Sequence, residues 1–143
     1  MKYLKLIIFA AVALLCSCHT PNEEPERLLD VTPTNIAGVW ELESYDGGAT
    51  LAEGSYVYID FVRSDRTFTL YQNIDSMEEV VKQGRYYIEI DPELGAIIRG
   101  TYGTDEYDYK EWTHRYIVEL SEDWMRWTAK DDRADVSIYR RKN

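Results

Sequence analysis

The chain has 143 residues and a formal net charge of −10, and 45% of its residues are hydrophobic. A chain of this length suits one domain and not two. The negative charge argues against nucleic acid and against an anionic membrane surface as partners, because both would repel the protein. Aromatic residues make up 13% of the chain, and such a content favours β-strands.

The first 17 residues predict a secretory signal peptide. Lys2 and Lys5 provide a basic start, and the run from Leu6 to Leu15 is apolar throughout. This run is shorter than the ~20 residues that a helix needs to cross a bilayer. The pattern is therefore typical of a cleaved export signal and not of a membrane-spanning anchor.

The signal ends in Leu15-Cys16-Ser17-Cys18, which resembles the bacterial lipobox. The resemblance implies cleavage before Cys18 and acylation of that residue, for example with palmitate. Cys18 fits better than Cys16, because cleavage before Cys16 would place the bulky Leu15 beside the cut. We therefore expect an exported lipoprotein of the outer membrane, on the periplasmic face or at the cell surface. An ordinary cleaved signal with incidental cysteines is the alternative.

Residues 18–36 predict a flexible tether between this signal and a folded domain at 37–143. Three of the four prolines fall between His19 and Asn35, where apolar side chains are few. The acidic stretch from Asn22 to Glu26 resembles short signals that send some lipoproteins to the cell surface. A solvated linker explains the same charges.

From residue 37 onward, the sequence predicts eight short strands whose connections alternate between long and short. The short connections are Ser64–Asp65, Asp91–Glu93 and Ser121–Glu122, and the long ones are 45–54, 73–82, 103–110 and 130–133. In an up-and-down antiparallel sheet, every second connection lies at the same end. The tight turns should therefore gather at one end of the sheet and the long loops at the other.

Alternation within the strands indicates a closed sheet. In the first strand, for example, Trp40 and Leu42 point to one face and the glutamates between and after them to the other. One apolar and one polar face on nearly every strand fits a single wall around one core. We therefore predict an all-β fold, an eight-stranded antiparallel up-and-down β-barrel, with an open sandwich as the alternative.

Strand direction sorts the inner residues by depth. Towards the tight-turn end we expect a bulky, aromatic interior: Trp40, Phe61, Phe68, Ile90, Leu120, Met125 and Arg140. Towards the loop-rimmed end we expect a mixture of apolar and polar side chains: Val57, Gln72, Tyr86, Tyr102, Trp112, His114 and Trp127. Such a mixture suits a ligand pocket, which is mostly apolar with a few polar groups that fix orientation.

The opening of the first strand, Gly38-Val39-Trp40, resembles the Gly-X-Trp signature of lipocalins. Arg140, expected to face inward near the end of the last strand, looks like the basic residue that packs over that tryptophan. The likeness covers most of residues 37–143 and is closest to the small lipocalin-like domains of bacterial lipoproteins. It implies that Gly38, Trp40 and Arg140 are structural. The chain is shorter than a full-length lipocalin, which puts a large cavity in doubt.

We therefore predict a membrane-tethered barrel that binds a small, mainly apolar ligand at its open end. A second hypothesis is a filled barrel that contacts an envelope protein or a glycan through its loops or through the outward tyrosines Tyr56, Tyr58, Tyr87 and Tyr139. A third is an enzyme with His114 as base, although no nucleophile motif accompanies this histidine. The sequence contains no metal-ligand spacing or phosphate loop, so we expect neither a metal nor a cofactor.

Overall fold

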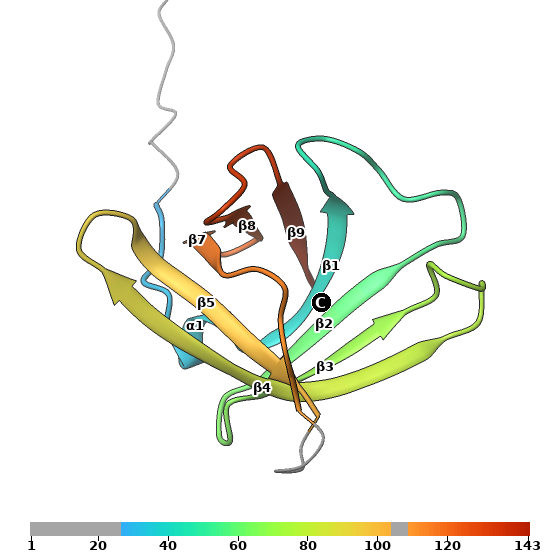
Figure 1. The fold of residues 1–143 in the computed structure, drawn as a ribbon, viewed down its shortest axis with the longest axis horizontal. Coiled ribbons are helices and arrows are strands. Elements are labelled where there is room, and N and C mark those ends of the chain that lie inside the picture. The colour runs from blue at the N-terminus through green and yellow to red at the C-terminus, as the bar shows by residue number, and fades with distance from the viewer. Residues whose placement is uncertain (1–26, 104–108) are drawn as a thin grey trace, which may run out of the picture.

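The computed structural model describes residues 27–103 and 109–143 (Figure 1). Its elements are α1 (Pro33–Ile36), β1 (Gly38–Ser44), β2 (Val57–Val62), β3 (Thr67–Gln72), β4 (Val80–Asp91), β5 (Gly95–Tyr102), β6 (Lys110–Glu111), β7 (Tyr116–Leu120), β8 (Trp124–Ala129) and β9 (Val136–Lys142). The signal peptide, Cys18 and the first part of the tether lie outside the described residues. No helix in the described ranges is long and apolar enough to cross a membrane.

The strands close into an eight-stranded antiparallel barrel, as the sequence predicts. β1 pairs with β2 on one side and with β9 on the other, and β4 and β5 form a long hairpin. β6 and β7 both pair with β5, through Thr101↔Glu111 and Ile98↔Tyr116 respectively. They are therefore two halves of the sixth strand, interrupted at residues 112–115.

Tight turns gather at one end of the barrel, which we call the base, and long loops gather at the other, the mouth. The turn between β4 and β5 forms because the Asp91 carboxylate accepts the backbone N–H groups of Glu93 and Leu94, at 2.8 and 3.0 Å. These two bonds also lower the pKa of Asp91. In the turn between β7 and β8, the Ser121 hydroxyl accepts the N–H groups of Asp123 and Trp124 in the same way, at 3.3 and 3.2 Å.

The core lies inside the barrel and is dominated by large side chains. Its fully buried members include Trp40, Phe61, Tyr86, Ile98 and Leu120. They occupy alternate strand positions, so neighbouring strands contribute to the same layer, as Phe61 and Phe68 do. Burying one such side chain stabilises the fold by ~1.5–3 kcal/mol.

The chain before β1 closes the base. Thr32 caps α1 by accepting the Asn35 N–H at 3.1 Å, and Pro33 fits the first helical position because it has no N–H to satisfy. Ile36 is fully buried, and the Leu29 N–H donates to the Leu120 carbonyl at 2.7 Å. Residues 28–36 therefore belong with the folded domain and not with the tether that their composition predicts.

The prediction of which β9 side chains face the barrel interior is wrong: the inward positions are shifted by one residue. Tyr139 pairs with Leu42 and Met125 and is buried, whereas Arg140 is exposed and donates to the Glu43 carboxylate at 2.9 Å. Arg141, and not Arg140, packs over Trp40. The apolar alternation of β9 is misleading because its β-branched residues, which suit a strand on either face, lie on the outer wall.

Candidate ligand-binding cavities

The barrel encloses a chamber of about 270 Å³ near the mouth, which we call the mouth chamber. Half of its lining residues are aromatic: Phe68, Tyr102, Trp112, Tyr116, Trp127 and Tyr139. Val57, Leu70, Gln72 and Ile74 complete much of the remaining wall. Among the residues that the structure describes, its lining contains no charged side chain, so the chamber suits an uncharged molecule.

Trp127 is the centre of the aromatic lining. Its ring stacks on Trp112 with centroids 5.7 Å apart and 29° between planes, and it also contacts Tyr116 at 5.0 Å and Tyr139 at 4.9 Å. Trp112 meets Phe68 edge to face at 5.1 Å. Such pairs add ~0.5–1.5 kcal/mol each beyond their buried area, so the walls of the chamber are held in place by one another.

Trp112 reaches the chamber because β5 has a glycine opposite it. A Cβ on Gly100 would lie 2.4 Å from Cε2 of Trp112, so the indole lies directly on the backbone of β5. The backbone N–H of Trp112 donates to the backbone carbonyl of Gly100 at 2.9 Å. This contact occurs where the sixth strand is interrupted, between β6 and β7.

Two tryptophans and two tyrosines of the chamber lining carry buried polar groups. The indole Nε1 atoms of Trp112 and Trp127 are buried, and neither has a hydrogen-bond partner in the described part of the chain. Burial, reinforced by the Asp135 carboxylate, raises the pKa of Tyr116 to about 12, and burial also raises the pKa of Tyr139. Both phenols therefore keep their protons at neutral pH.

Five of the seven predicted ligand-binding residues line the mouth chamber. They are Val57, Gln72, Tyr102, Trp112 and Trp127. His114 does not line it: its Nδ1 lies 2.8 Å from a carboxylate oxygen of Asp131, and this hydrogen bond lowers the pKa of Asp131. Tyr86 lies near the base, because β4 begins earlier than predicted and the Tyr86 N–H bonds to the carbonyl of Arg66 in the β2–β3 turn.

The prediction missed several lining residues for different reasons. Strand direction predicts Phe68 at the base, yet its ring contacts that of Trp112 in the chamber wall. Alternation places Tyr116 on the same face as Trp112, but the sorting of inner residues by depth does not assign it to the mouth. Tyr139 was missed because of the one-residue error in β9.

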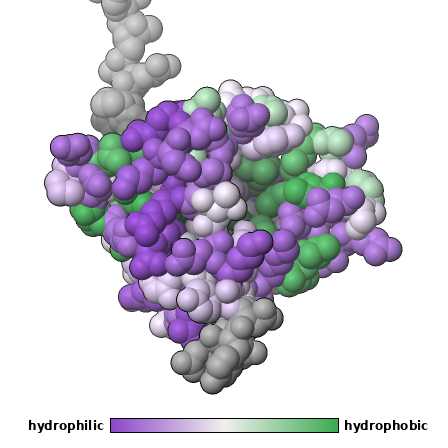
Figure 2. Space-filling view, viewed as in Figure 1, coloured by the Kyte–Doolittle hydropathy of each residue, from purple (hydrophilic) through white to green (hydrophobic). Residues whose placement is uncertain are grey.

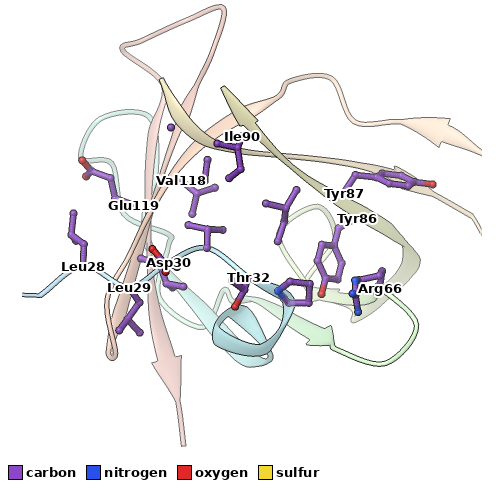
Figure 3. A pocket seen from close by; sticks show the side chains of 16 residues that line it. Leu28, Leu29, Asp30, Thr32, Arg66, Tyr86, Tyr87, Ile90, Val118 and Glu119 are labelled. Atoms are coloured by element: carbon purple, nitrogen blue, oxygen red, sulfur yellow. The ribbon is translucent and has the colours of Figure 1, made fainter. Parts of the chain in front are cut away.

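A second and larger cavity, of about 850 Å³, lies at the base; we call it the base cavity (Figure 3). Its walls come from the segment before α1, from the β4–β5 hairpin and from β7. Figure 3 shows Arg66 beside Tyr86 on one side, and Asp30 and Glu119 on the other. The sequence contains no local indication of this cavity, since the segment that forms one wall has the composition of a tether.

Residues 27–103 and 109–143 contain no cluster of three or more potential His, Cys, Asp or Glu ligands for a metal ion. The fold and cavities define a closed eight-stranded β-barrel with an aromatic interior chamber. The chain matches no protein-family model, and no curated protein is significantly similar to it.

Proposed function

We propose that the protein is a membrane-tethered, lipocalin-like barrel that binds a small, mainly apolar ligand in the mouth chamber. Lipidation of Cys18, export and the outer-membrane location enter this proposal from the sequence alone. The lining supports it, because large aromatic faces with a few polar groups are typical of small-molecule sites. The chamber volume of about 270 Å³ restricts the ligand to a compact molecule.

The pair of unpaired indole N–H groups carries this proposal. A buried donor without a partner costs ~1–3 kcal/mol, and Trp112 and Trp127 place two such donors beside one chamber. An indole N–H can only donate. The ligand should therefore combine an apolar body with an acceptor oxygen, such as a carbonyl. Because neither Nε1 atom is exposed in the empty chamber, an indole ring has to shift for this oxygen to reach it.

Native mass spectrometry of the gently purified chain tests the proposal. We expect a reproducible extra mass that is lost on denaturation and in Trp112→Phe, which removes one N–H but keeps an aromatic ring. Trp124→Phe is the matched control, because Trp124 lies outside the chamber lining. A clean apo mass, together with no binding of small aromatic ketones, would argue against the proposal.

An interaction module remains the second candidate, favoured by exposed apolar residues near the mouth. Ile74, Met77, Val80 and Val81 are all exposed on or beside the β3–β4 connection, and Figure 2 shows hydrophobic surface on that side of the view. Crosslinking in intact cells with Met77→Glu as a control would test a partner there; a crosslink that survives this change would argue against this surface.

The outward tyrosines give that second candidate less support. Tyr56 stacks on Tyr58 with ring centroids 5.1 Å apart and donates its hydroxyl to Glu79 at 2.7 Å. Tyr87 lies under the Arg99 guanidinium at 4.3 Å. These rings are engaged by side chains of the same chain, and Tyr139 is not on the outer wall at all.

A further inference from the structure

The base cavity exists because the barrel wall opens on one side. Pairing between β5 and β7 ends at Ile97↔Ile117, and beyond it the β4–β5 hairpin stands away from β7 (Figure 1). Ile90, at an inner position of β4, consequently has an exposed fraction of 73%. Apolar residues that face the inside of a barrel and yet meet solvent indicate a place where something apolar can bind.

The lining of this cavity differs in kind from that of the mouth chamber. The apolar residues that line it are mainly aliphatic and include Leu29, Val31, Ile88, Ile90, Ala96 and Val118. Figure 3 shows Ile90 and Val118 extending into it from β4 and β7. Flexible aliphatic walls suit an alkyl chain better than a flat ring, and a volume of about 850 Å³ is within the usual range for ligand sites.

Positive charge is concentrated at one end of the cavity. Arg66 lines it there, and the same side chain lines a shallow neighbouring pocket together with Arg63, Ser64 and Thr34. In the described ranges neither arginine forms an ion pair, and Arg66 donates only to the Arg63 carbonyl. Asp65 shares this turn and bonds to the Ser64 hydroxyl at 3.2 Å.

The opposite end carries negative charge. Asp30 and Glu119 lie there (Figure 3), and Arg126 pairs with Glu119 at 2.7 Å. Glu119 is thus neutralised by Arg126, whereas the carboxylate of Asp30 forms no ion pair in the described ranges and would repel an anion. An anionic group should therefore bind at the Arg66 end. An amphiphile would then have one orientation only, with its charged group near the two arginines and its chain between Ile90 and Val118.

We propose that the base cavity is a second binding site, separate from the mouth chamber, for an anionic amphiphile with a single alkyl chain. The chain occupies the aliphatic cavity, and the anionic head lies in the shallow pocket that Arg63 and Arg66 help to line. Guanidinium groups suit phosphate and carboxylate oxygens, because they can donate two parallel hydrogen bonds. The site does not depend on the proposed ligand of the mouth chamber.

Isothermal titration of the full chain with decyl phosphate, decanol and inorganic phosphate, below the micelle concentration, tests this proposal. We expect one decyl phosphate per chain, with decanol at least tenfold weaker because it lacks the charged head. Inorganic phosphate should bind more weakly still, because it lacks the chain. Equal affinity for decyl phosphate and decanol, binding of many molecules per chain, or no binding would each overturn the proposal.

Variants locate the site. Arg63→Gln/Arg66→Gln should reduce the affinity for decyl phosphate to that for decanol, and Ile90→Glu should weaken both; Ile90 is exposed, so this change leaves the fold intact. Arg133→Gln, an exposed arginine in the connection between β8 and β9, is the charge control. Trp112→Phe should bind decyl phosphate normally. A loss of binding in Trp112→Phe would place the amphiphile in the mouth chamber and overturn the proposal.

Discussion

The guanidinium of Arg141 lies 4.2 Å from the centre of the Trp40 ring and ties three parts of the chain to the base. It donates to the carbonyls of Asn35 at 2.9 Å, Ala37 at 2.8 Å and Glu122 at 2.8 Å. The Trp40 indole in turn donates to the Ile36 carbonyl at 2.9 Å. This pair therefore holds the end of α1, the start of β1 and the β7–β8 turn against β9.

Arg141→Ala should lower the free energy of unfolding by ~3 kcal/mol, because charge-assisted bonds to backbone carbonyls are lost and those carbonyls become unpaired. Arg140→Ala should cost no more than ~0.5 kcal/mol, since its ion pair with Glu43 is exposed. Urea denaturation of both variants measures the difference. Equal losses would mean that Arg141 does not organise the base. Arg141→Lys should not restore stability, because an ammonium cannot donate in the same planar geometry.

Gly100→Ala should abolish ligand binding in the mouth chamber. The added methyl group would overlap the Trp112 indole, and the ring would have to move into the space that the ligand needs. The strain should destabilise the barrel by ~1–3 kcal/mol. Native mass spectrometry and urea denaturation report the two effects. Thr101→Ala, one residue away on the outer wall, is the control; unchanged binding in Gly100→Ala would show that the chamber tolerates a displaced indole.

Stability should fall as the pH rises above about 10, the ordinary pKa of tyrosine. Burial raises the pKa of Tyr116 to about 12 and raises that of Tyr139 further. The folded state therefore keeps protons that the unfolded state releases, and this contribution is complete below pH ~10 and lost progressively above it. Urea midpoints between pH 8 and ~11.5 would show the decline. Tyr139→Phe should make it shallower, whereas an unchanged slope would assign the decline to other groups.

Arg66→Gly should stabilise the protein while removing part of the proposed amphiphile site. Arg66 has a φ of 57°, a left-handed conformation that costs a side-chain-bearing residue ~1–2 kcal/mol and glycine almost nothing. We expect a gain of ~1 kcal/mol in the free energy of unfolding and weaker binding of decyl phosphate. Arg85→Gly, within β4, should instead destabilise. A destabilised Arg66→Gly would mean that contacts of the Arg66 side chain outweigh the strain.

The sequence predicts the barrel well because its signals are local. Turn residues such as Asp91 and Ser121 form their hydrogen bonds within a few residues, and alternation places Trp40 and Ile98 inside correctly. The last strand defeats the same reasoning, since the face of β9 is decided by pairing with β1 and β8 and not by its own apolar pattern.

The mouth chamber is partly predictable because strand alternation is also a local signal, whereas the base cavity is not predictable from the sequence. Inner residues near the mouth follow from strand parity, so Trp112 and Trp127 could be grouped from the sequence. The base cavity depends on two long-range events, the docking of Leu29 onto Leu120 and the separation of the β4–β5 hairpin from β7. Neither event leaves a local pattern in the chain.

The Leu29–Leu120 hydrogen bond also determines how the domain responds to mechanical load. Any pull on the chain ahead of Arg27 reaches this bond first, whereas Arg141 secures Asn35 and Ala37 several residues further on. Under tension we therefore expect Leu29 to detach early and remove one wall of the base cavity, while the barrel around the mouth chamber stays closed. Force applied at the N-terminal end would thus release an occupant of the base before it disturbs one at the mouth.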